Sequence, residues 1–161
     1  MIALSVTWMC YGRWRSFQEA KENFYYAIQF NDVSIVRALL NRHPSLIRTE
    51  SPMFRVPGDL SIYTAWETPL SVAVMHESRE VFDYLLSRSA DPNAAGRAQG
   101  PPIIRAVVPD DTYYFKTLLD HGADPSAKDG HGKTASDYAK KWGKSKILDL
   151  ISKHRPQEPP A

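Results

Sequence analysis

The chain has 161 residues, of which 24% are charged and 43% hydrophobic, and its formal net charge is +2. This length suits one domain with its own core, and 8 glycines and 12 prolines are close to an average share, which excludes collagen-like and low-complexity proteins. The single cysteine, Cys10, cannot form an internal disulfide. A disulfide-framed secreted protein is therefore excluded, and we expect a reducing, cytoplasmic location.

The first eleven residues, Met1 to Tyr11, are uncharged and mostly apolar. This run is shorter than the roughly 18 residues that a membrane span needs. It lacks a basic start, and Gly12-Arg13-Trp14-Arg15 follows where a signal peptide would carry small residues. We therefore expect no membrane span and no secretion signal. Residues 1–15 are interpreted as a separate N-terminal segment, either a docked strand or helix or a disordered start.

An internal repeat follows this segment. The alanines Ala73, Ala106 and Ala139 are 33 residues apart, and the pairs Leu85-Leu86 and Leu118-Leu119 keep the same offset. A further copy lies upstream around Ala27, displaced by 46 residues, which is one period plus an insertion of 13. We call these the first to fourth copies, in chain order from Ala27 to Ala139.

Each copy has the pattern of two short helices. Pro69 and Pro102 suit a first helical turn, where a missing N–H costs nothing, and Thr68 and Thr134 can cap that turn. Apolar residues then recur at helical spacing in a second segment of each copy. The sequence predicts eight helices, near residues 17–30, 33–43, 69–76, 79–88, 102–108, 111–121, 134–141 and 144–153.

The 33-residue period and Thr68-Pro69-Leu70-Ser71-Val72-Ala73 resemble the ankyrin-repeat family, whose motif is T-P-L-H-x-A. The resemblance covers about residues 22–153 and implies an all-α solenoid of stacked helix-turn-helix units. We expect a single ankyrin-repeat domain over residues 16–154 and a disordered tail over residues 155–161. Asn93 stands where some animal ankyrin repeats are hydroxylated, although Pro92 departs from the usual residue there.

A long connection over residues 48–67 separates the first and second copies. It contains Phe54, Ile62, Tyr63 and Trp66, and an apolar segment of this kind must pack or bind. Two interpretations stay open: a loop folded over its own stack, or an elongated finger that touches a partner.

Motifs for catalysis are missing from the sequence. No H-E-x-x-H, C-x-x-C, G-x-S-x-G or P-loop pattern occurs, and Gly130-His131-Gly132-Lys133-Thr134 lacks the upstream spacing of a P-loop. We therefore expect no catalytic residue, no metal, no cofactor and no small-molecule substrate. Residues 128–155 carry eight basic and three acidic residues, which favours a solvated helix face over nucleic-acid binding.

The resemblance implies a monomer that binds another protein through a concave surface of first-helix ends and finger loops. An alternative is a small inhibitor or toxin-neutralising protein that blocks a partner enzyme with the same surface. Large apolar side chains among the implied positions support binding, although Phe30 and Trp142 could instead cover the seams between copies. The candidate partner-binding residues are Phe30, Phe54, Trp66, Met75, His76, Arg97, Val108, His131, Lys141 and Trp142.

Overall fold

The computed structural model describes residues 2–51, 66–96, 100–109 and 111–154, with only the backbone of residues 2–14. These residues contain eight α-helices and no strand; two isolated bridges join Gly96 to Gly100 and Lys128 to Thr134. The helices are α1 (Ile2–Gln29), α2 (Val33–Arg42), α3 (Pro69–Met75), α4 (Arg79–Ser87), α5 (Pro102–Arg105), α6 (Tyr113–Asp120), α7 (Ala135–Lys141) and α8 (Ser145–His154), with a 3-10 turn η1 (Pro44–Arg48) after α2.

Side-chain caps begin the first helices of the second and fourth copies. The Thr68 hydroxyl accepts a hydrogen bond from the N–H of Ser71. At α7, Thr134 and Asp137 cap each other's backbone N–H groups in a reciprocal capping box. Pro69 and Pro102 occupy first helical turns, as their fixed φ favours.

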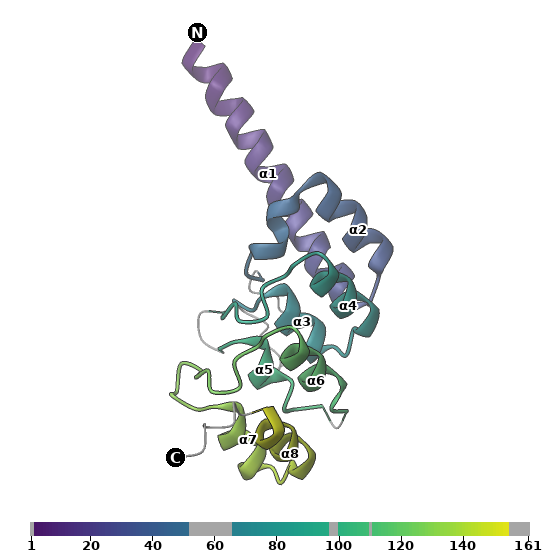
Figure 1. Ribbon diagram of the computed structural model, residues 1–161. Coiled ribbons are helices and arrows are strands. Elements are labelled where there is room, and N and C mark those ends of the chain that lie inside the picture. Colours follow the sequence, from purple (N-terminus) through teal and green to yellow (C-terminus); the bar gives the residue numbers. More distant parts are fainter. Residues whose placement is uncertain (1, 52–65, 97–99, 110, 155–161) are drawn as a thin grey trace, which may run out of the picture.

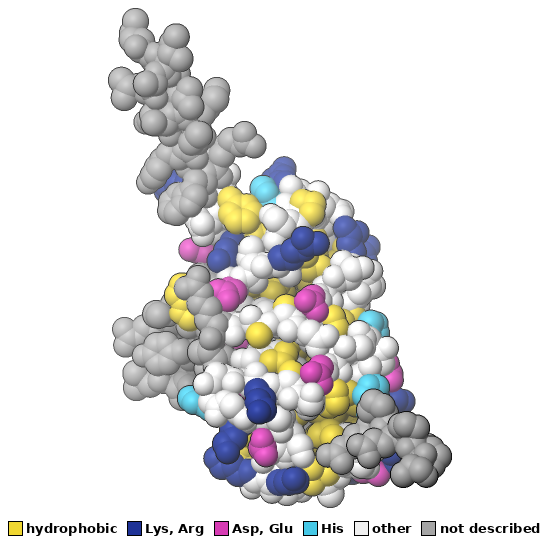
Figure 2. All heavy atoms as spheres, turned by 60° about the vertical axis from the view of Figure 1, so that its left-hand side comes forward, with side chains coloured by type: hydrophobic (Ala, Val, Ile, Leu, Met, Phe, Trp, Pro, Cys, Tyr) yellow, Lys and Arg dark blue, Asp and Glu magenta, His cyan; other side chains and the backbone are white. Residues whose placement is uncertain are grey.

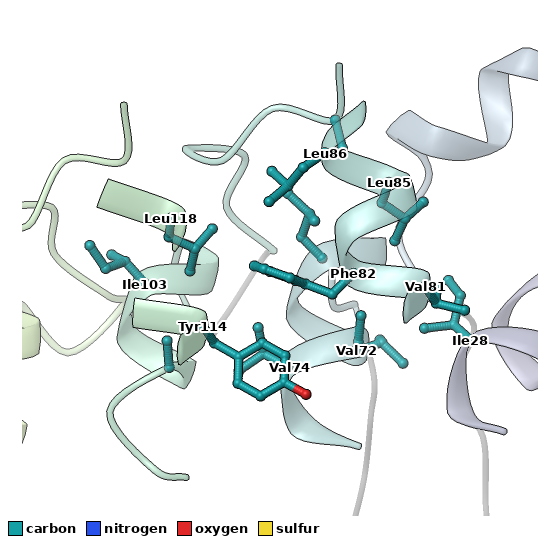
Figure 3. Packing of buried hydrophobic residues seen from close by; sticks show 14 of the residues in the cluster. Ile28, Val72, Val74, Val81, Phe82, Leu85, Leu86, Ile103, Tyr114 and Leu118 are labelled. Atoms are coloured by element: carbon teal, nitrogen blue, oxygen red, sulfur yellow. The ribbon is translucent and has the colours of Figure 1, made fainter. Parts of the chain in front are cut away.

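The helix pairs stack in one row (Figure 1). The first helices α1, α3, α5 and α7 pack consecutively, and α4 packs against α2 as α8 packs against α6. Apolar residues from neighbouring copies meet between the pairs; Figure 3 shows Phe82 of α4 beside Tyr114 of α6, whose ring centroids are 5.1 Å apart at 81°. One core therefore runs through the stack, as a repeat array requires.

The expected all-α fold of stacked helix pairs is confirmed, with two corrections. The helix predicted to end at 108 stops at Arg105, because Pro109 disfavours helical backbone at Val108 and has no N–H to donate. α1 begins at Ile2, whereas the sequence predicted a helix from about residue 17. The boundary expected at residue 15 therefore falls inside one continuous helix.

The ends of the long connection are held together. Ser51 donates its N–H to the carbonyl of Glu67 over 2.7 Å, and Trp66 donates to the carbonyl of Ser51 over 3.2 Å. The buried Tyr25 hydroxyl of α1 donates to the carbonyl of Thr49 over 2.6 Å. Residues 52–65, including Phe54, lie outside the described residues, as does the tail 155–161, so the two interpretations of this connection stay untested.

Candidate partner-binding surface

The first helices of the first, second and fourth copies end in the same tight turn. The carbonyls of Ala27, Ala73 and Ala139 accept backbone N–H groups from residues five positions later, at 2.8, 2.9 and 2.8 Å. The turn residues Asn31, Glu77 and Gly143 have φ of 55°, 53° and 65°, in the left-handed region. In these three copies the residues just before the turn are therefore presented at equivalent places along the stack.

The fourth copy presents an aromatic pair at this position. Trp142 caps the end of α7, is 44% exposed, and lies with its ring centroid 5.1 Å from that of Tyr138, at 31°. The Tyr138 hydroxyl donates to Asp129 Oδ2 over 2.6 Å. The indole thus rests on a ring whose far end is fixed to the preceding finger.

Asp129 also organises that finger. Its Oδ1 accepts the N–H groups of His131 at 2.8 Å and Lys133 at 2.9 Å, and its own N–H donates to the Lys133 carbonyl. Burial opposes ionisation of the Asp129 carboxyl, but the hydrogen bonds from Tyr138, Lys133 and His131 prevail and hold its pKa below the ordinary value. An ionised Asp129 therefore joins finger and helix.

A buried ion pair connects the second and third copies. Glu67, only 1% exposed, pairs through Oε1 with Nη2 of Arg105, and Arg105 Nε lies 3.1 Å from the same oxygen. Burial raises the pKa of the Glu67 carboxyl, while the Arg105 guanidinium opposes that rise. The Arg105 side chain stays 23% exposed, so it borders the surface as well as the pair.

A close backbone contact sets the place of Trp66. Trp66 has φ of 66° and is 36% exposed, and its carbonyl oxygen would lie 2.1 Å from a Cβ added at Gly96. Only glycine at position 96 allows the connection after α4 to approach the end of the long connection this closely.

Basic side chains gather at the end of the stack. Between residues 128 and 154 there are seven lysines and three aspartates. Figure 2 shows dark blue side chains at the lower end, where α7 and α8 lie. Lys144 Nζ also donates to the carbonyl of Val108 over 3.1 Å and so bridges the third and fourth copies.

Comparison with known proteins agrees with the repeat geometry. The ankyrin-repeat family model matches residues 66–97. A curated ankyrin repeat-containing protein of Treponema pallidum (strain Nichols) is 34% identical over 106 residues, which are 66% of this chain. The family-model match, this relative and the stacked helix pairs together support an ankyrin-repeat family. The chain spans about a third (34%) of the length of that relative. Ankyrin repeats generally act as protein-protein interaction modules and not as enzymes.

The ankyrin-repeat positions chosen from sequence differ in exposure. Val108 is 55% exposed and Trp142 44%, His131 and Lys141 are exposed, and Met75 is half-buried. His76 is also half-buried; its Nε2 has no hydrogen-bond partner among the described residues, and burial lowers its pKa. Arg97 and Phe54 lie outside the described residues.

Phe30 belongs to a different neighbourhood. It is 80% exposed and borders a groove on the outer side of the first ankyrin repeat, together with Tyr26, Ile35 and Leu39. The structure does not bring it together with the aromatic pair of the fourth copy.

Three surface residues were missed from the ankyrin sequence pattern: Arg105, Tyr138 and Asp129. The repeat spacing holds a signal for two of them, since Arg105 and Tyr138 stand 33 and 66 residues after the buried Val72. Among the four copies only the second has an aliphatic residue at this position, and so wide a variation in residue type marks a local change of role. Asp129 has no comparable signal, because aspartate is ordinary in a turn.

No group of three or more His, Cys, Asp or Glu side chains suited to a metal occurs in the described part of this ankyrin-repeat chain. None of its described helices is both long and apolar enough to cross a membrane.

Proposed function

We propose that this chain binds a partner protein through the first-helix ends and fingers of its second to fourth copies. One observation carries the proposal: the exposed Trp142 ring rests on Tyr138, which Asp129 fixes to a finger. A large aromatic side chain held in place before binding loses little conformational entropy on association, which is a common property of binding hot spots.

Further exposed apolar residues support the same surface. Val108 and Trp66 are large hydrophobic residues with 55% and 36% exposure; Val108 belongs to the third copy, and Trp66 lies at the end of the long connection. Lys141, which precedes Trp142 in the sequence, is exposed, and so is Lys133 in the loop that Asp129 holds. We therefore propose a partner segment with apolar side chains and an acidic end, which the lysines would attract.

The test needs the partner first. Affinity capture with the full chain, followed by mass spectrometry, identifies candidates, and calorimetry with each purified candidate measures its affinity. Trp142→Ala is expected to weaken binding by about 1–4 kcal/mol, the range for an aromatic hot spot. Lys116→Ala, an exposed position on α6, is the matched control and should leave affinity unchanged.

Association and dissociation rates at several salt concentrations distinguish the aromatic contact of Trp142 from the attraction by the lysines. Lys141→Glu should mainly slow association and reduce its salt dependence, whereas Trp142→Ala should mainly speed dissociation. A captured partner whose affinity responds to neither change would overturn the assignment of this surface. The cytoplasmic location expected from the single cysteine stays a prediction.

A further inference from the structure

A second surface lies along the seam between the outer helices of the first and second copies. It is formed by α2, η1 and the end of α4, whereas the surface proposed above consists of first-helix ends and fingers. A neighbouring cavity of about 370 Å³ shares Ile47 and Arg48 with this seam and extends to Leu70 and Ala90. The cavity on the seam itself measures about 420 Å³, and its lining residues are Leu40, Pro44, Ser45, Ile47, Arg48 and Arg88.

The cavity on the seam has an apolar floor and a basic rim. Leu40 is 2% exposed and Ile47 is partly buried, whereas Arg48 and Arg88 are exposed. Because Leu40 is recessed, an apolar group of a ligand reaches it only by entering the cavity. The volume lies within the range of about 300–1,000 Å³ that is usual for ligand pockets, and it is enough for one large side chain.

Positive charge dominates both chain segments that form the seam. Residues 33–49 contain three arginines and no aspartate or glutamate, and residues 84–90 contain Arg88 and no acidic residue. The acidic residue that lines the neighbouring cavity, Asp91, already accepts the N–H of Asn93 at 2.9 Å. We call the two cavities together with Arg37, Arg42, Arg48 and Arg88 the arginine groove.

The fold leaves most of these arginines without a carboxylate partner. In the described part of the chain, no ion pair or side-chain hydrogen bond involves Arg42, Arg48 or Arg88. Arg37 lies over the ring of Tyr84, with Cζ 5.4 Å from the ring centroid. Tyr84 stands one helical turn before Arg88 on α4, so Arg37 lies on the same seam as Arg88.

Helix ends explain part of this charge. Arg42 lies in the last turn of α2 and Arg88 caps the C-terminal end of α4, where cations stabilise the helix dipole. This account covers neither Arg37, in the middle of α2, nor the apolar cavity that Arg48 and Arg88 both line. A ligand that combines negative charge with an apolar group would use both features.

We infer that the arginine groove binds an acidic segment of a partner protein, with an apolar side chain of that segment in the cavity and its carboxylates on Arg48 and Arg88. A guanidinium offers paired N–H donors that match a carboxylate, and arginine is among the residue types enriched in binding hot spots. The recessed Leu40 favours a peptide over a bilayer, which needs apolar side chains that project, and over nucleic acid, which has no aliphatic side chain to fill the cavity.

Selection from a random peptide library displayed on phage, with the full chain immobilised, tests the inference. Enriched peptides should combine aspartate or glutamate with a large apolar residue. Fluorescence anisotropy of the synthesised peptides then measures their affinity for each variant. Arg48→Gln and Arg88→Gln should each raise the dissociation constant at least about tenfold, because each removes a charge-assisted contact. Arg88→Lys keeps the charge but loses the planar fork, so its effect should be intermediate.

Two controls separate this groove from other surfaces. Lys116→Gln removes the same charge from an exposed position on α6 and should leave the affinity unchanged. Trp142→Ala alters the surface proposed for the partner protein and should also have no effect on these peptides. Circular dichroism melting should be nearly the same for all variants, since exposed arginines without partners contribute little to stability.

Several results would overturn the inference. A selection that enriches no acidic peptide contradicts it, and so does an equal loss of affinity in Lys116→Gln and Arg88→Gln, which indicates non-specific attraction. Acidic peptides that respond to Trp142→Ala but not to Arg88→Gln would bind at the finger surface, which contradicts the groove and leaves the proposed function intact. Flotation with phosphatidylglycerol vesicles, lost in R48Q/R88Q, would assign the arginines to a lipid surface instead.

Discussion

The hydroxyl of Tyr138 and the Oδ2 of Asp129 are 2.6 Å apart, and this hydrogen bond joins the loop before α7 to α7 itself, the first helix of the fourth copy. The bond has two consequences. It keeps the Tyr138 ring beneath Trp142, and it fixes the carboxylate that holds the finger's own N–H groups. The position of Trp142 and the conformation of the loop at residues 129–133 therefore both depend on the Asp129 carboxylate.

Removal of this carboxylate should loosen the finger without unfolding the stack. In Asp129→Ala, the amides of His131 and Lys133 lose their acceptor, and their hydrogen exchange should accelerate at least about tenfold, since local opening no longer breaks those bonds. Tyr138→Phe keeps both acceptor bonds and should have a smaller effect. NMR-detected exchange makes the comparison; equal rates in all three proteins would contradict the proposed role of Asp129.

The buried leucines should determine the stability of the array. Leu86 and Leu119 are 7% and 5% exposed and belong to the continuous core. Either change to Ala is expected to cost about 2–5 kcal/mol in the free energy of unfolding, measured by urea titration. A broadened transition is also expected, because loss in the middle of a linear array uncouples its ends. The exposed Lys116→Ala should stay within about 0.5 kcal/mol of the parent.

Glu67 and Asp129 should give opposite pH dependences. The Glu67 pKa is raised in the folded chain, so the folded state binds its proton more tightly and its contribution to stability falls as pH rises above the unfolded value, near 4.5. The Asp129 pKa is lowered, so its contribution is present above about 3.8 and is lost as pH falls through the folded value.

Unfolding free energies from pH 3 to 8 make this measurable. The stability of the parent relative to Glu67→Gln should decrease with rising pH, while that relative to Asp129→Asn should increase. Parallel slopes in the two comparisons would show that one of the two environments is misassigned.

Gly96 should be intolerant of any side chain. A Cβ there would lie 2.1 Å from the Trp66 carbonyl oxygen, so Gly96→Ala must displace the backbone at Trp66. Gly132→Ala is a useful comparison, because Gly132 has φ of 72° but no atom within 4 Å of an added Cβ. The Gly132 change should cost about 1–2 kcal/mol from backbone strain alone, and Gly96→Ala should lower the melting temperature further. Equal melting temperatures would contradict the close contact.

The repeat spacing predicts most of the fold. Alanines every 33 residues and the apolar residues between them are enough to predict eight helices, because apolar residues at helical spacing indicate a helix with one buried face. The end of α5 at Arg105 follows from Pro109, a local effect that the repeat alignment concealed. The full length of α1 was missed because its first half has no repeat partner in the sequence.

The surface is less accessible to sequence analysis. The repeat positions mark Trp142 and Val108 as candidates, but the support of Trp142 depends on a hydrogen bond across nine residues, from Tyr138 to Asp129. Phe30 occupies an equivalent first-helix position and yet borders another groove, together with Tyr26, Ile35 and Leu39. Repeat position alone does not decide exposure, because Met75 and His76 stand at the positions equivalent to Val108 and Trp142 and are half-buried.

The backbone hydrogen bonds between Ser51 and Glu67 also make it possible to replace the sequence between these two residues. These hydrogen bonds, with the bond from Tyr25 to Thr49, hold the two ends of the long connection together and fix them to α1. Closing a longer or shorter loop at a fixed base changes the free energy by only about 0.6 kcal/mol for each doubling of length. Recognition sequences of different lengths could therefore be grafted between these two residues while the helical stack keeps its register.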